Sequence, residues 1–159
     1  MSYETIRDQL QVVISGVSGM GTVHPYQRWS TNWSKFLDHY KDESSGKING
    51  CAITRTGKDK MLRPGSVVEW AQIFTCRFYY GLKDADASEI VFQLLIDDVD
   101  DAILQNQTLN GSCETTWPNW GPMKGVDGLK IDIIDTRMFG NVLCHFAEGR
   151  VCALEMENF

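Results

Sequence analysis

The fold of this chain is decided by a stretch in which apolar and polar residues alternate, Val67-Val68-Glu69-Trp70-Ala71-Gln72-Ile73-Phe74-Thr75-Cys76-Arg77-Phe78-Tyr79-Tyr80. Large apolar side chains occupy most even-numbered positions, and polar residues such as Glu69, Thr75 and Arg77 lie between them. A period of two is typical of a strand with one face in contact with water. We therefore expect a strand over about 67–80.

The segments on either side of this strand predict three helices and four further strands. We expect helices over about 3–16, 30–41 and 86–105, and strands over about 47–56, 129–135, 142–147 and 150–156, the last two forming a hairpin around Glu148-Gly149. The order α-α-β-β-α-β-β-β lacks the β-α-β alternation of a doubly wound sheet. It predicts an α+β fold, with helices packed on one face of a mostly antiparallel or mixed sheet.

The chain has 159 residues, of which 43% are apolar, and this size fits a single domain over 1–159. Polar residues predict loops over 56–65 and 106–127. In the first helix Ser2 is the expected N-cap, and in the third Asp86 and Glu89 are the expected capping box. The third helix has an expected buried stripe of Val91, Leu94, Leu95, Val99, Ala102 and Ile103.

Most of the negative charge of the chain lies in one segment. The formal net charge is −6, which argues against a protein that grips nucleic acid or docks on an anionic membrane. Residues 84–101 hold seven acids and no Lys or Arg, which leaves 14 acids against 15 bases elsewhere. The acidic segment covers most of the third predicted helix and the turn before it.

The aspartates of this helix could suggest a divalent metal site, but they are spread around the helix and predict a solvated face instead. They are Asp97, Asp98, Asp100 and Asp101. Asp98 lies at the edge of the apolar stripe, and a buried carboxylate needs a partner. We therefore expect an Arg, a Lys or a neighbouring subunit to reach Asp98.

The cysteines and histidines show no metal or redox spacing. The five cysteines include no C-x-x-C pair, which favours reduced thiols in an intracellular setting. Cys144 and His145 are adjacent, but neighbours on a strand point to opposite faces. A nucleophilic pair of Cys144 or Cys152 with His24 or His39 stays open as an alternative. We expect no metal, no cofactor, no membrane span and no secretory signal.

Two tryptophans, Trp117 and Trp120, lie in the polar loop Trp117-Pro118-Asn119-Trp120-Gly121-Pro122. Exposed tryptophans mark contact surfaces. The alternative is that the loop folds them back under the core, and the sequence leaves both possibilities open.

The chain resembles the small tail-terminator, tail-completion and neck proteins of long-tailed bacteriophages and prophages. The similarity lies in the order and texture of segments along most of the chain. These segments are the N-terminal helix Tyr3-Glu4-Thr5-Ile6-Arg7-Asp8-Gln9-Leu10, the aromatic segment Trp33-Ser34-Lys35-Phe36-Leu37, the strand Ile48-Asn49-Gly50-Cys51-Ala52-Ile53-Thr54-Arg55, the strand end Phe78-Tyr79-Tyr80-Gly81-Leu82, the acidic turn Asp84-Ala85-Asp86-Ala87-Ser88-Glu89 with the helix Phe92-Gln93-Leu94-Leu95-Ile96, and the final Cys144-His145-Phe146. The 106–127 loop and the cysteines have no counterpart in that pattern.

The resemblance implies a structural protein of the virion, assembled in the host bacterial cytoplasm. Terminators of this kind have an α+β fold and commonly form a hexameric ring that caps the tail tube and joins it to the head connector. The resemblance implies no enzyme activity and no cofactor, and it implies a homo-oligomer, the tail tube protein and the connector or neck protein as partners.

A ring needs two different complementary patches on each subunit. We expect the acidic helix, through Asp97, Asp98 and Asp101, to supply one patch, and the basic loop with Lys58, Lys60 and Arg63 to supply the other. These regions meet between subunits, or one of them faces the tail tube. The alternative function is a small intracellular α+β enzyme or ligand-binding domain with a pocket near Cys144 and His145.

Overall fold

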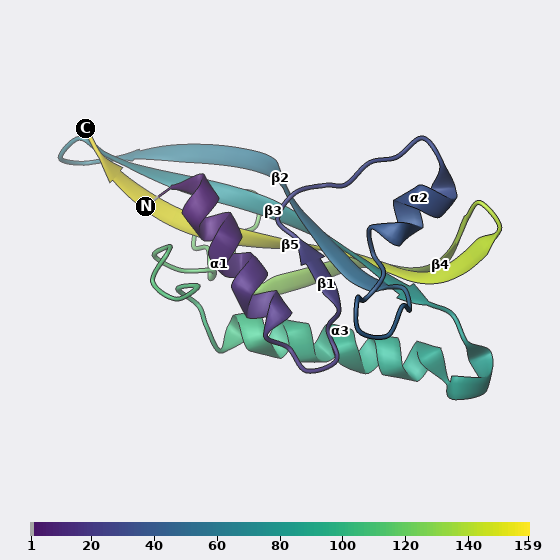
Figure 1. Cartoon of the computed structure of the whole chain (residues 1–159). Helices are drawn as coiled ribbons and strands as arrows, with labels where there is room; N and C mark the ends of the chain where they lie inside the picture. Colours follow the sequence, from purple (N-terminus) through teal and green to yellow (C-terminus); the bar gives the residue numbers. More distant parts are fainter. Residues whose placement is uncertain (1) are drawn as a thin grey trace.

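A long twisted sheet of five strands runs through the middle of the molecule, and helices pack against both of its faces (Figure 1). The computed structural model describes residues 2–159. Its elements in chain order are α1 (Tyr3–Ser15), β1 (Thr22–His24), α2 (Trp33–Asp38), β2 (Asn49–Arg63), β3 (Val67–Gly81), the 3-10 helix η1 (Asp84–Asp86), α3 (Ser88–Leu104), β4 (Leu129–Phe139) and β5 (Val142–Asn158). The predicted α+β class is confirmed.

The sheet is mixed, with the strand order β1-β2-β3-β5-β4. β1 pairs with β2 in parallel, and every other pair of neighbours is antiparallel. The stretch that begins at Val67 forms β3, the central strand, as its alternation predicts. The first helix begins as expected, because the Ser2 hydroxyl accepts a hydrogen bond from the Thr5 N–H at 3.2 Å.

The alternation along β3 divides the core into two layers. Phe74, Cys76 and Phe78 pack with α1 and α3 on one face. Tyr79 points to the opposite face and packs with Phe36 of α2. The expectation that helices occupy one face therefore holds for α1 and α3, whereas α2 covers the other face.

The 106–127 segment folds over one end of the sheet, on the face against which α2 also packs. The Glu114 N–H and the Thr115 carbonyl bond to Leu154, at 2.8 and 2.9 Å, and thus extend the sheet beyond the end of β4. The segment then crosses to the second face, where Met123 is buried against Cys152 and neighbouring apolar residues. The residue pattern within 106–127 does not predict this packing, because the residues that the segment contacts lie on β3 and β5.

The hairpin expected around Glu148-Gly149 is wrong, because β5 runs without interruption through these residues. The turn lies earlier, between β4 and β5, where Gly140 adopts a φ of 64°. Gly149 serves a different purpose: a Cβ there would lie 2.9 Å from the Lys130 carbonyl oxygen and 2.9 Å from the Leu129 side chain. The glycine permits a close approach of β4 to β5.

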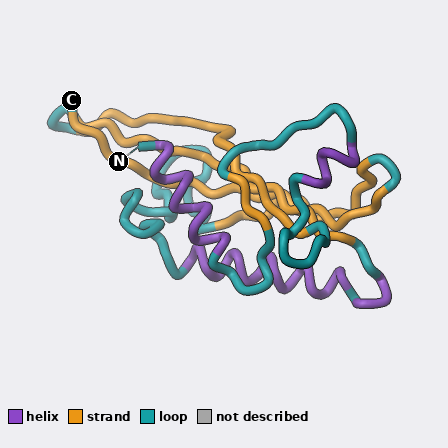
Figure 2. The backbone as a smooth tube through the Cα atoms, in the orientation of Figure 1, coloured by secondary structure: helices purple, strands orange, loops and turns teal. Residues whose placement is uncertain are grey.

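The loop expected over 56–65 is also mostly wrong, because β2 continues to Arg63 and pairs with β3 along its whole length. We call the projecting part of the β2–β3 hairpin, residues 56–72, the arm. Figure 2 shows the arm as a long ribbon of strand at one end of the molecule. The polar residues of the arm are typical of a loop, so the sequence did not predict a strand there. The strand β1 has three residues and is too short to be predicted.

Candidate interaction surfaces

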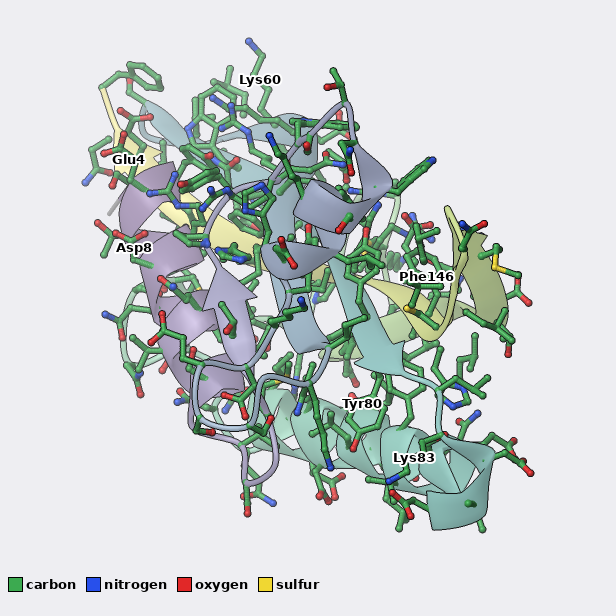
Figure 3. The ribbon with its side chains drawn as sticks, turned by 45° about the vertical axis from the view of Figure 1, so that its right-hand side comes forward. Glu4, Asp8, Lys60, Tyr80, Lys83 and Phe146 are labelled. Atoms are coloured by element: carbon green, nitrogen blue, oxygen red, sulfur yellow. The ribbon has the colours of Figure 1, made fainter. Side chains whose placement is uncertain are left out.

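The arm carries two exposed lysines on one aromatic ring. The Lys58 and Lys60 ammonium nitrogens lie 4.1 and 5.7 Å from the centroid of Trp70. The Trp70 indole N–H donates to a Glu157 carboxylate oxygen at 2.9 Å, which fixes the ring. A cation–π contact of this kind orients a lysine and leaves its charge at the surface. Figure 3 shows Lys60 pointing away from the rest of the molecule.

Arg63 has an internal partner, unlike the two lysines. Its guanidinium lies 3.2 Å from one Glu69 carboxylate oxygen and 3.3 Å from the other. The Glu69 side chain is only 4% exposed, and it also accepts a hydrogen bond from the Trp120 indole. Arg63 therefore stabilises the arm, and this role limits what it can add to a docking patch.

The two loop tryptophans have different environments, so each alternative applies to one of them. Trp120 packs against the small apolar cluster on the α2 face and donates to Glu69. Trp117 stays 43% exposed. Trp117 remains a candidate contact residue, and Trp120 is part of the structure that supports the arm.

The acidic residues of α3 are exposed. Asp97, Asp98 and Asp101 all lie at the surface, and none of them forms an ion pair with another residue in 2–159. The expectation of a buried Asp98 is wrong, because the buried stripe lies further round the helix. The half-buried acid of α3 is Asp100. Desolvation raises the pKa of its carboxyl group, and a hydrogen bond from the Leu129 N–H opposes this by lowering the pKa.

The apolar stripe expected on α3 is only partly buried. Leu95, Val99 and Ile103 are buried as expected, and Phe92 and Ile96 complete the stripe. Val91 and Leu94 are instead 46% and 57% exposed. Ile90, at 59% exposure, lies one turn before Leu94 on the outward side of the helix. We call Ile90, Leu94, Asp97 and Asp101, which share this side, the apolar–acidic row.

A hollow of about 260 Å³ lies beside α2, on the face of the sheet opposite to α3. We call it the aromatic hollow. Its lining comprises Gln27, Trp29, Ser30, Trp33, Phe36, Arg77, Tyr79, Arg137, Phe139, Phe146 and Glu148. Trp29 and Trp33 are 74% and 53% exposed. The sequence reasoning missed this site, although the aromatic residues between Tyr26 and Tyr40 were a signal for it.

Cys144 and His145 lie on opposite faces, as their positions on one strand predict. Cys144 is buried beneath α2, and desolvation raises the pKa of its thiol to about 11. The pKa of Cys152 is also raised to about 11, mainly by burial. Both thiols are therefore neutral near pH 7, which is the reverse of what a nucleophilic cysteine needs.

His145 is packed beneath α3. Its ring stacks on Phe92 with centroids 5.6 Å apart, and its Nε2 lies 2.8 Å from the Ser88 hydroxyl. The same hydroxyl accepts from the Lys83 N–H at 2.9 Å, so it bonds to Lys83 and His145 at once. Ser88 thus ties the start of α3 to β5, a role that the expected capping box of Asp86 and Glu89 does not perform.

The arm and α3 lie far apart within the molecule. In Figure 1 the hairpin of β2 and β3 projects at the upper left, whereas α3 runs along the lower side. Figure 3 places Lys60 and Lys83, just before α3, at opposite ends of the view. The lysines of the arm and the aspartates of α3 form no ion pair with each other within residues 2–159.

Two remaining features of the described residues concern metal binding and membrane spanning. Within residues 2–159, no three His, Cys, Asp or Glu side chains are grouped so as to hold a metal ion. The helices described here are all too short or too polar to cross a membrane.

Comparison with known proteins adds no assignment. No known protein family matches this chain. No curated protein matches it either. Any assignment of function therefore rests on the residues and the geometry above.

Proposed function

We propose that this chain is a structural protein of a bacteriophage tail or neck, a tail terminator that forms a ring, caps the tail tube and joins it to the head connector. The proposal unites the resemblance in the sequence with the arrangement of exposed surfaces. In this role the protein acts through contacts with copies of itself, with the tube protein and with the connector.

One observation carries the proposal: the molecule presents surfaces of different chemistry that point in different directions. The arm presents the exposed Lys58 and Lys60, and the outward side of α3 is apolar and acidic. A ring is built from such head-to-tail contacts, in which one patch of each subunit meets a different patch of the next. Exposed apolar residues such as Ile90 and Leu94 are typical of a surface that is covered in an assembly.

The alternative of an enzyme or ligand-binding domain near Cys144 and His145 draws less support. These side chains belong to separate layers of the core. Burial keeps the Cys144 thiol protonated, and His145 is hydrogen-bonded to Ser88.

The test is tube capping by the charge-reversed variant Lys58→Glu/Lys60→Glu. In a genome that encodes this chain we expect a tail tube gene nearby, and its purified product is the probe. The wild-type chain should stop tube growth at a fixed length and remain at one end in electron micrographs. The variant should lose capping, because both lysines are exposed and reversing their charge opposes the contact with the tube.

Arg63 is left unchanged in this test, because it stabilises Glu69 and its loss would disturb the arm itself. The matched control is Lys47→Glu, an exposed lysine outside the arm. A wild-type chain that neither assembles nor caps the tube would overturn the proposed function. If the arm variant assembles and caps as well as the control does, the assigned role of the arm is wrong.

A further inference from the structure

The aromatic hollow is a surface depression with aromatic walls. Phe36, Tyr79 and Phe146 are buried around it, and Trp29 and Trp33 stand exposed at its edge. Tryptophan, tyrosine and arginine are the residues that dominate the energy of protein interfaces. Its volume of about 260 Å³ has room for a branched aliphatic side chain.

The charged residues at the aromatic hollow indicate which charged group a partner would need. The Arg77 guanidinium is paired with Glu148 at 2.8 Å. Arg137 is 3.6 Å from Asp135 and lies 4.1 Å over the ring of Phe146, with 42% of its side chain exposed. A loosely paired arginine on an aromatic ring favours a carboxylate in the occupant. The complementary partner therefore has an aliphatic anchor followed by an acid.

The apolar–acidic row of α3 has this chemistry. Ile90 and Leu94 supply exposed aliphatic side chains, and Asp97 and Asp101 continue the same side of the helix over the next two turns. Neither aspartate forms an ion pair with another described residue. The row and the hollow lie on opposite faces of one sheet.

We infer that the apolar–acidic row of one copy seats in the aromatic hollow of the next copy, with Leu94 as the anchor and Arg137 facing the aspartates. The inference rests on the proposed ring and names its subunit contact. Because the two surfaces are different and lie on opposite faces, the contact is head-to-tail and can close into a ring. The arm then lies outside this contact and is free to face the tube.

A charge swap tests the contact in the full chain. Arg137→Glu and the pair Asp97→Arg/Asp101→Arg should each raise the dissociation constant of the assembly about tenfold or more, because each places like charges together. The two changes combined in one chain should restore much of the association, since every contact then has opposite charges again. Sedimentation at rising concentration measures all four proteins.

Cross-linking gives a second measurement that does not depend on charge. The five native thiols are buried, so a bis-maleimide should join only introduced cysteines. Leu94→Cys/Ser30→Cys should yield a ladder of covalent oligomers, and neither single variant should. Leu94→Cys/Leu62→Cys is the matched control, because Leu62 is 77% exposed but lies on the arm, and it should give no ladder.

The outcomes separate the contact from the function. A ring that persists unchanged in Arg137→Glu and in Asp97→Arg/Asp101→Arg overturns this contact and leaves the proposed ring standing. A dimer cross-linked by Leu94→Cys alone also overturns it, because α3 would then meet its own copy across a two-fold axis. A wild-type chain that never assembles removes the proposed function itself.

Discussion

Glu69 shows how a single residue fixes the arm. Its carboxylate is buried and is held by Arg63 on the arm and Trp120 in the covering loop. The sequence identified Arg63 as a candidate contact residue through its place in a basic loop, and Trp120 because exposed tryptophans mark contact surfaces. It did not reveal their shared partner, because Glu69 is 51 residues away from Trp120 along the chain.

Loss of the Glu69 site should destabilise the fold much more than loss of an exposed lysine. Removing one partner of a buried ion pair leaves an uncompensated charge, at a cost of about 3–5 kcal/mol. Because Arg63 is itself 37% exposed, we expect about 2 kcal/mol for Arg63→Ala, and Lys60→Ala should stay within about 0.5 kcal/mol. Urea unfolding measures the difference, and equal midpoints for these two variants would refute the assigned role of Arg63.

The buried histidine makes stability depend on pH. Desolvation lowers the pKa of His145, although nearby Glu89 partly opposes this, so the folded protein protonates this ring less readily than the unfolded chain does. The unfolded chain binds a proton below its ordinary pKa of about 6.5, and stability is therefore lost as the pH falls through that value. Burial lowers the pKa of His24 as well, which adds to the loss.

We expect His145→Gln, which keeps a hydrogen-bond partner for Ser88, to unfold with a smaller loss of stability between pH 7 and pH 5 than the wild type. The comparison of the two slopes isolates His145 from Asp100, whose raised pKa acts in the opposite direction. Urea midpoints at several pH values provide the measurement. Parallel slopes for the two proteins would contradict this account.

At the scale of elements, periodicity predicted the long helices and the central strand well. It failed where a partner elsewhere in the chain decides the structure. The polar residues of the arm form a strand because β3 pairs with them, and Glu148-Gly149 forms no turn because β3 and β4 flank it. The pattern also predicted an apolar stripe on α3 but not its width, so Leu94 was expected in the core.

Gly149 should be the glycine in the sheet least able to accept a side chain. Its Cβ would meet the Lys130 carbonyl oxygen, which is backbone and cannot move aside. We expect Gly149→Ala to cost about 1–3 kcal/mol through overpacking. Gly57→Ala is the matched control, because a Cβ there would meet only the Ile73 side chain, at 3.1 Å.

The control should cost less than Gly149→Ala, since the Ile73 side chain can rotate. Thermal unfolding of both variants, compared with the wild type, provides the readout. If Gly57→Ala proves the more damaging change, the close approach between β4 and β5 is not what selects glycine at 149.

At the scale of the whole molecule, the excess acidic residues are concentrated on α3, where we propose that they form part of a subunit contact. The net charge of −6 arises from α3 and the turn before it. The sequence alone predicted an acidic docking helix, and the structure adds two features that were not predicted. These are the exposed aliphatic residues on the same side of α3 and the aromatic hollow on the opposite face of the sheet.

The mass of the purified chain in solution tests the central claim most directly. Native mass spectrometry at rising concentration should detect a closed complex with a fixed number of subunits, and six chains of 18.0 kDa give about 108 kDa. Head-to-tail contacts that close should leave no larger open chains at the highest concentration. A protein that stays at 18.0 kDa at every concentration and in the presence of its tail tube, or that stops at a dimer, would contradict the account.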